Sequence, residues 1–268
     1  MNRLSTERKR AILGALVEGC SIRSTQRMTG ADKKTITRLL VRVGEGCAGM
    51  MDDRMRDLDC YNLQIDEVWS YVGKKQGRLS DDERREGMKG DQYVFVALDA
   101  DTKLVPSWRV GPRNMDTTLA FMRDLDSRLR CRPQITTDGF SPYQLAVPFV
   151  FSGNVDFATE VKTYTHEDAG RGRYAPPRVS ASNVTVQWGD PAPEGISTSF
   201  VERSNLTLRM HSRRFTRLTN AYSKSLRNLK AAVGLHFAWY NFVRIHRTLR
   251  VTPAMEAGVT GRLYCSAR

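Results

Sequence analysis

The sequence predicts an α/β protein in which a small helical unit precedes a mixed β-sheet. Three observations support this class: apolar residues at helical spacing near the N-terminus, alternating apolar residues between positions 63 and 110, and helical spacing again after position 198. Glycine and proline gather between positions 152 and 198, which indicates a loop-rich insertion with a strand and a helix near residues 155–164.

With 268 residues, the chain is long enough for one large core and one small domain. The changes of pattern divide it into a helix-turn-helix unit, a linker, a sheet domain with an insertion at 152–198, and a basic C-terminal tail. These parts are expected at residues 1–48, 49–62, 63–250 and 251–268, respectively.

The N-terminal unit is expected to contain three short helices, over residues 6–17, 21–28 and 32–43. Ser21 and Asp32 are suitable N-cap residues, and Gly30 can take the positive φ of a tight turn. A glycine-containing turn followed by a basic helix is typical of helix-turn-helix DNA-binding units, although a protein–protein module is the alternative. The residues exposed for DNA contact would be Lys33, Lys34, Thr37 and Arg38.

Four strands are expected in the sheet domain, over residues 63–72, 93–98, 104–110 and 134–138. A helix capped by Asp116 would connect the third strand to the fourth, and a further helix is expected near residues 142–146. Three strands as a meander, a crossover helix and a strand that ends in aspartate form the order of a ribonuclease H-like core.

The C-terminal part is expected to form two basic helices, over residues 198–218 and 222–245. The second helix carries an apolar stripe, made of Leu226, Leu229, Val233, Phe237 and Tyr240.

The net charge of +13 indicates a polyanionic partner. Lysines and arginines outnumber acidic residues by 12 to 8 in residues 1–60 and by 13 to 1 in residues 203–268, whereas residues 61–202 contain 17 against 20. A mildly acidic centre between basic ends fits an enzyme that holds metal ions centrally and binds DNA phosphates on both sides. A solvated basic surface is the alternative.

Several other classes are disfavoured. The chain has no run of about 18 apolar residues, so no membrane partner is expected. Its first residues lack the apolar stretch of a signal peptide, which favours a cytoplasmic protein. The five cysteines are odd in number and none has Cys-x-x-Cys spacing, so neither a disulfide framework nor a structural zinc site is expected.

Three acidic residues stand out because each lies in a differently built segment: Asp66 in QIDEVW, Asp138 in ITTDGF and Glu202 in FVERSN. Two strand-borne aspartates and one helix-borne glutamate suit two Mg²⁺ ions roughly 3.5–4 Å apart, an arrangement that cleaves phosphodiesters. Mg²⁺ prefers carboxylate oxygens, so such a site needs neither histidine nor cysteine, and Mn²⁺ is expected to substitute.

Other acidic residues are weaker candidates. Glu67 follows Asp66 but should face the other side of the strand, which predicts a structural role. Asp99 and Asp101 lie in the expected hairpin turn, where aspartate is common. Glu160 and Glu194 are rivals for the third ligand. Glu160 lies close after Asp138, but it lacks the basic helix that follows Glu202, which is the favoured residue.

Basic and polar residues follow Glu202 on the expected helix. Asn205 and Arg209 lie on the same helical face as Glu202, where they could orient its carboxylate or hold a phosphate; polar surface residues are the alternative. The basic surface would continue toward DNA through Arg213, Arg214 and Arg217.

Residues 200–209 (FVERSNLTLR) resemble the final-glutamate motif of the first-described family of bacterial insertion-sequence transposases, of the DDE class. Residues 66–73 (DEVWSYVG) are similar to its first-aspartate motif and residues 137–139 to its second. Residues 240–242, His246 and residues 252–254 resemble a tail motif that is widespread among such transposases. The resemblance covers nearly the whole chain.

The resemblance implies a ribonuclease H-like catalytic core, Mg²⁺ dependence, cleavage at the element's 3′ ends and transfer of the 3′-hydroxyl into target DNA. It makes Asp66, Asp138 and Glu202 the metal ligands of a bacterial, nucleoid-associated enzyme. Because two element ends must meet, a homodimer or higher oligomer on DNA is expected. Some family members carry N-terminal zinc-binding cysteines, which this chain lacks.

Two other functions fit the same residues. One is a catalytically silent or domesticated DNA-binding regulator, and the other is a structure-selective nuclease of the same fold. The helix-turn-helix pattern favours sequence-specific binding over the nuclease.

Overall fold

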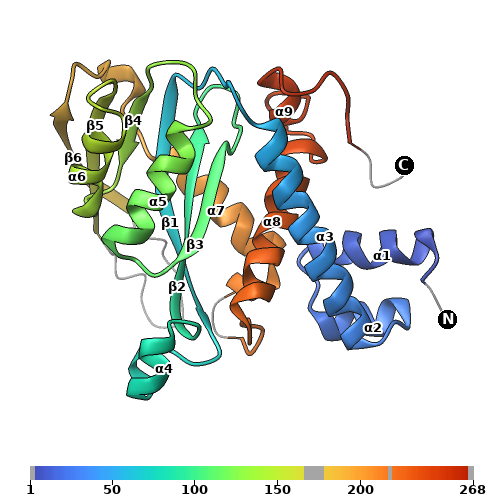
Figure 1. Ribbon diagram of the computed structural model, residues 1–268. Coiled ribbons are helices and arrows are strands. Elements are labelled where there is room, and N and C mark those ends of the chain that lie inside the picture. The colour runs from blue at the N-terminus through green and yellow to red at the C-terminus, as the bar shows by residue number, and fades with distance from the viewer. Residues whose placement is uncertain (1–3, 166–177, 217–218, 265–268) are drawn as a thin grey trace.

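The computed structural model describes residues 4–165, 178–216 and 219–264. Its strands form one six-stranded mixed sheet in the order β3-β2-β1-β4-β5-β6 (Figure 1). The strands are β1 Asn62–Val72, β2 Gly90–Asp99, β3 Ser107–Gly111, β4 Gln134–Thr137, β5 Asp156–Thr165 and β6 Arg178–Trp188. The protein is therefore α/β, with a sheet compatible with a ribonuclease H-like core.

The order of strands follows from their pairing. β1, β2 and β3 form an antiparallel meander, and β4 then pairs in parallel with β1. β5 continues in parallel with β4, and β6 closes the edge antiparallel to β5. The parallel β1–β4 pair places the carboxyl end of β4 beside Ile65 in the first half of β1, which positions the candidate site.

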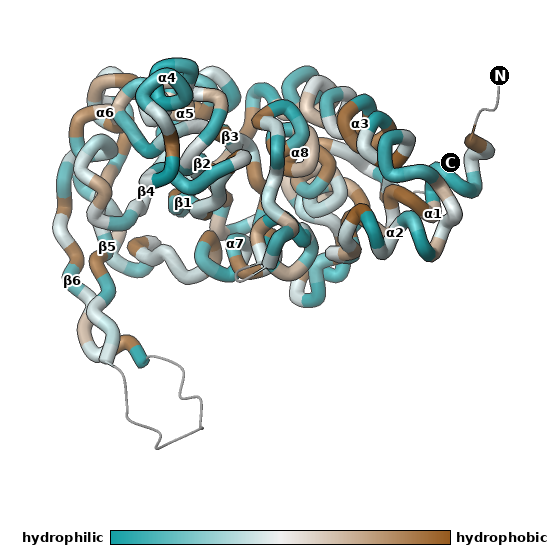
Figure 2. The backbone as a smooth tube through the Cα atoms, turned by 90° about the horizontal axis from the view of Figure 1, so that it is seen from below, coloured by the Kyte–Doolittle hydropathy of each residue, from teal (hydrophilic) through white to brown (hydrophobic). Residues whose placement is uncertain are grey.

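Helices cover both faces of the sheet. The sheet-domain helices are α4 Asp81–Glu86, α5 Met115–Asp126, α6 Pro142–Val150, α7 Ser199–His211, α8 Leu226–Phe242 and α9 Pro253–Glu256. Short 3-10 turns lie at Gln76–Arg78, Pro193–Gly195 and Arg213–Phe215. α5 packs on β2 and β3 and α7 on β1 and β2, from opposite faces of the sheet (Figures 1 and 2). None of these helices, nor any other in the described ranges, is long and apolar enough to cross a membrane.

The N-terminal helices are α1 Thr6–Val17, α2 Ile22–Thr29 and α3 Lys33–Arg54. Ser21 and Asp32 cap α2 and α3 as predicted, and Gly30 ends α2 with a φ of 63°. The start of the crossover helix differs from the prediction, because Asn114 and not Asp116 caps α5.

The linker expected at residues 49–62 is helical as far as Arg54, where α3 ends. Met51 and Met55 are buried in the main core, so this extension of α3 belongs to the packed interior. α3 lies along α8 (Figure 1), and a Cβ atom on Gly44 would lie only 2.0 Å from the carbonyl oxygen of Ala231. The N-terminal helices are thus packed on the sheet domain rather than tethered to it.

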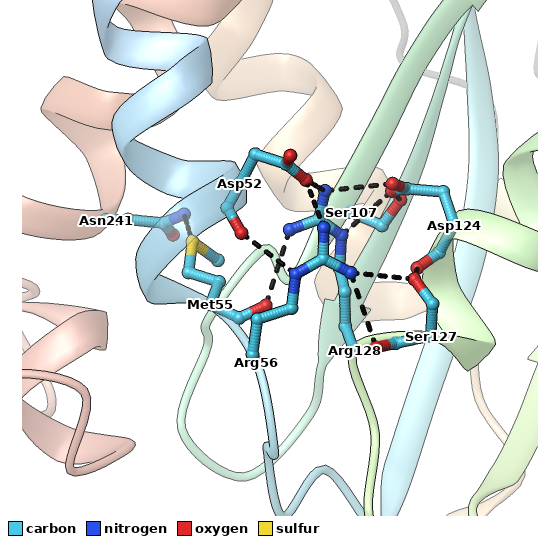
Figure 3. A network of polar contacts seen from close by, with 8 residues as sticks. All are labelled: Asp52, Met55, Arg56, Ser107, Asp124, Ser127, Arg128 and Asn241. Carbon is cyan, nitrogen blue, oxygen red and sulfur yellow. Dashed lines mark hydrogen bonds and ion pairs between the residues drawn. The ribbon is translucent and has the colours of Figure 1, made fainter.

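A polar network joins the end of α3 to α5 (Figure 3). The buried Arg128 guanidinium donates two hydrogen bonds of 2.9 Å to Asp124 and one of 2.7 Å to Asp52. Ser107 of β3 also donates to Asp124, at 2.5 Å. Burial raises the pKa of Asp124, but the bonds from Arg128 and Ser107 outweigh it and leave the pKa below its ordinary value.

The expected loop-rich insertion at residues 152–198 instead contains two strands of the sheet. The strand expected near residues 155–164 is β5, but the helix expected beside it is absent from residues 152–165. β6 was missed because it contains no glycine or proline and the composition of the whole segment hid it. Phe157 at the start of β5 is fully buried in the main core, so β5 and β6 are part of the sheet and not an addition to it.

The predicted apolar stripe of α8 lies in the core, where Leu229, Val233, Phe237 and Tyr240 are buried. Most of α8 is interior, which differs from the expected basic helix, because its basic residues Arg227 and Lys230 occupy only the exposed edge. Within the expected basic tail, α9 packs on α8 and buries Pro253 and Ala254.

Candidate metal centre and basic groove

The register of β1 and β4 brings the two aspartates together. Ile65 lies opposite Thr137 in the parallel pair. Asp66 follows Ile65 and Asp138 follows Thr137, so the two aspartates are neighbours. One carboxylate oxygen from each of Asp66, Glu67 and Asp138 can be chosen so that all three lie within 4.8 Å of one another. Three carboxylate oxygens at this spacing are suitable ligands for Mg²⁺ or Mn²⁺.

Asp66 is held by two hydrogen bonds. Its Oδ1 accepts from the Glu67 backbone N–H at 2.7 Å, and its Oδ2 accepts from Asn205 Nδ2 of α7 at 2.8 Å. Burial, aided by the charges of Asp138 and Glu202 and opposed by these two bonds, raises the pKa of Asp66 to about 6. A bound cation would favour the charged form of this carboxylate.

The sequence interpretation of Glu67 as a purely structural residue missed its place in this group. Strand alternation does give it different partners, since Arg113 Nε donates at 3.0 Å and Tyr143 of α6 donates its hydroxyl to the other oxygen. The longer glutamate side chain nevertheless brings its carboxylate beside Asp66 and Asp138. Burial, together with the charge of Asp138, raises the pKa of Glu67 to about 7.

Arg113 was also missed by the sequence reasoning. It bridges Glu67 and Asp138, with its second bond reaching Asp138 Oδ2 at 3.3 Å, and its guanidinium lies 3.8 Å from the centre of the Phe140 ring. An arginine in a loop before a predicted helix gives no sequence signal for this role, because only the sheet geometry brings it to the carboxylates.

Glu202 lies in the first turn of α7, outside the three-carboxylate group. Its Oε1 accepts from Lys162 Nζ of β5 at 2.7 Å and lies 2.8 Å from the Thr198 hydroxyl. Its charge still contributes to raising the pKa of Asp66, so the two carboxylates belong to one electrostatic site. Sequence reasoning did not identify Lys162 as a partner of Glu202. The one indication in the sequence is that Lys162 lies two residues after Glu160, so both side chains project from the same face of the strand.

The rival glutamates have other surroundings. Glu160 accepts from the Thr198 backbone N–H at 2.8 Å and from the Ser182 hydroxyl at 2.9 Å, so it fixes the start of α7 to β5. Glu194 is exposed in a 3-10 turn. Asp99 is buried and accepts from Thr102, as a turn residue does.

The polar residues expected after Glu202 lie in different surroundings. Asn205 is buried and bonds to Asp66, whereas Arg209 is half-buried on α7. Arg213 is exposed, and Arg214 donates to Ser223 Oγ at 3.0 Å while burial lowers its pKa to about 10. Arg217 is outside the described residues.

A groove of about 1180 Å³ lies between the N-terminal helices and the segment that joins α7 to α8. Thr37 and the neutral His236 are among its walls, and no acidic residue is among the described residues that line it. Seven basic residues line it: Arg23, Lys33, Lys34, Arg38, Arg213, Arg214 and Lys224. The four N-terminal residues predicted for DNA contact and two of the three arginines predicted after α7 therefore share one groove.

Contacts on either side hold the groove's walls in place. His211 Nδ1 at the end of α7 lies 3.2 Å from the Val17 carbonyl oxygen, and a Cβ on Gly19 would lie 2.5 Å from the Met210 carbonyl oxygen. Arg227 of α8 pairs with Glu45 of α3 at 2.6 Å. Close backbone approach at Gly19 makes the relative position of α1 and α7 specific.

The chain matches no protein-family model and no curated protein.

Proposed function

We propose that the protein is a DDE-type transposase of the insertion-sequence kind, which cleaves DNA at element ends and joins the freed 3′-hydroxyl to target DNA. The observation that carries the proposal is the meeting of Asp66 and Glu67, within β1, with Asp138, directly after β4, and the charge of Glu202 on α7 acts on Asp66. The resemblance of the segments around these residues to transposase motifs gives the proposal its reaction class.

The donor set fits divalent metal ions, because carboxylate oxygens are hard ligands and three acidic side chains meet here, with the charge of Glu202 near enough to act on Asp66. Asp66, Asp138 and Glu202 are the proposed ligands of two Mg²⁺ ions, with Mn²⁺ as a substitute, and Glu67 is added by the geometry. When bound, such ions polarise the phosphodiester and stabilise both the attacking and the leaving oxygen.

The chain's own residues position this site before any substrate arrives. Asn205 and the Glu67 backbone N–H fix both oxygens of Asp66, while Tyr143 and Arg113 fix Glu67. Carboxylates held in this way lose little conformational freedom when a ligand binds.

The basic groove supports DNA as the substrate. In the proposal α2 and α3 act as a helix-turn-helix that reads the terminal repeat, with Lys33, Lys34, Thr37 and Arg38 facing the DNA. Arg213 and Arg214 of the opposite wall would hold phosphates of the same duplex. Two protomers would have to meet to pair two element ends, which is the basis for a dimer or higher oligomer on DNA.

The proposal is tested by Mg²⁺- or Mn²⁺-dependent nicking and joining on DNA that carries the element's own ends. Asp66→Asn, Asp138→Asn and Glu202→Gln should each abolish both reactions, because each removes one proposed metal ligand. The matched control is Asp81→Asn on α4, whose side chain is 83% exposed and pairs only loosely with Arg84. Cleavage that survives Asp138→Asn would refute the mechanism, and cleavage without joining would favour a nuclease.

One observation favours a second function, that of a catalytically silent DNA-binding regulator. Glu202 is bonded to Lys162 and lies outside the three-carboxylate group, as expected if the site no longer turned over. Sequence-specific DNA binding with no metal-dependent nicking by the wild-type protein would establish this function in place of the first.

A further inference from the structure

Lys162 makes its shortest carboxylate contact with Glu202. Its ammonium lies 2.7 Å from Glu202 Oε1, 2.8 Å from the Thr198 hydroxyl and 3.5 Å from Glu160 Oε2. The Lys162 side chain is only 12% exposed, whereas the Glu202 side chain is 41% exposed. The lysine is therefore fixed by β5, and the glutamate is the partner that solvent and ligands can reach.

Glu160 does not need Lys162 for its own position. It already accepts hydrogen bonds from the Thr198 backbone N–H and from Ser182 Oγ, at 2.8 and 2.9 Å. Glu202 has no such backbone donor among its described contacts, and its bonded oxygen meets only Lys162 and Thr198. Lys162 is thus the charged group that sets where the Glu202 carboxylate lies.

This position keeps Glu202 out of the group formed by Asp66, Glu67 and Asp138. Lys162 and Thr198 already occupy Glu202 Oε1, so a divalent ion that binds this oxygen must displace one of these donors. An ion that binds the other oxygen, Oε2, still lies close to the ammonium, and the two positive charges repel each other.

We propose that Lys162 is a positioning residue that holds the Glu202 carboxylate in place and competes with a divalent ion for it. The inference rests on the proposed metal site. In the loaded site, a lysine released from Glu202 remains fixed on β5 beside the carboxylates, where its charge can face a DNA phosphate.

The test measures Mn²⁺ binding by electron paramagnetic resonance and calorimetry, without DNA and without an activity readout. Lys162→Met keeps the length of the side chain and removes its charge, so the weaker Mn²⁺ site should bind roughly five- to tenfold more tightly. Lys162→Arg retains the competing cation and should stay within about twofold of wild type. Circular dichroism of each variant verifies that α7 remains folded.

The same measurement in a Glu202→Gln background separates competition from a general effect of charge. If Lys162 acts through Glu202, Lys162→Met should change Mn²⁺ affinity little once the carboxylate is gone. Unchanged or weaker binding in Lys162→Met alone, or the same gain in both backgrounds, would overturn this inference and leave the metal site standing. Absence of any Mn²⁺ binding by the wild-type protein would instead overturn the proposed function as well.

Discussion

Replacing Gly44 by alanine tests how closely the N-terminal helices are joined to the rest of the molecule. A Cβ atom at this position of α3 would lie 2.0 Å from the Ala231 carbonyl oxygen and 2.6 Å from its carbonyl carbon, whereas ordinary contact begins near 3.4 Å. Both neighbours are backbone atoms of α8, so no side-chain rotation can relieve the clash. The two helices would have to separate by roughly 1 Å or more, which opens the packing around them.

The magnitude follows from two opposing effects. Overpacking of this kind costs about 1–3 kcal/mol, and contact between two helix backbones belongs at the upper end. Alanine also gains about 1 kcal/mol over glycine in a helix interior. We therefore expect Gly44→Ala to lower the free energy of unfolding by about 2 kcal/mol, which corresponds to roughly 4–8 °C in melting temperature.

Gly46 provides the matched control, because it lies in the same helix, is exposed and has no atom within 4 Å of an added Cβ. Gly46→Ala should stabilise the protein by about 0.5–1 kcal/mol through helix propensity alone. The two substitutions are compared by urea unfolding followed by circular dichroism. If Gly44→Ala stabilised the protein as Gly46→Ala does, the close packing of α3 on α8 would be wrong.

Three further predictions concern other parts of the chain. Arg128→Met should lower the free energy of unfolding by about 3 kcal/mol in urea, because it leaves the partly buried Asp124 without its cationic partner. Arg130→Met, at an exposed ion pair, should lower it by less than about 1 kcal/mol, and equal losses would contradict this reasoning. Burial lowers the pKa of His236 to about 3, so only the unfolded state gains this proton between about pH 6.5 and 3. The free energy of unfolding should therefore decrease by up to about 1.4 kcal/mol for each unit by which the pH is lowered in this range. His236→Phe should flatten that slope, and an unchanged slope would disprove the assignment. Lys34→Ala should weaken DNA binding across sequences and reduce the slope of log affinity against log salt by about 1 in a titration, and no change in slope would remove Lys34 from the phosphate contacts.

Local patterns in the sequence were sufficient for the elements that depend on neighbouring residues. The caps at Ser21 and Asp32, the turn at Gly30 and the strand that carries Asp66 all follow from short-range chemistry and alternation. The prediction failed where composition was averaged over a long segment, as for β6. It also failed at the end of α3, where Met51 and Met55 are buried in the main core although the spacing of apolar residues in this segment does not indicate a helix.

The candidate site divides in the same way. The sequence by itself determined that Asp66 lies on a strand, that Asp138 follows one and that Glu202 opens a helix, because strand period and helix start signals are local properties. Only the tertiary structure decided that Glu67 lies beside Asp66 and Asp138. It also decided that Arg113 bridges Glu67 and Asp138 and that Lys162 donates to Glu202. These contacts join strands, helices and loops far apart in the chain, and their geometry comes from sheet register and helix packing, which no single segment encodes.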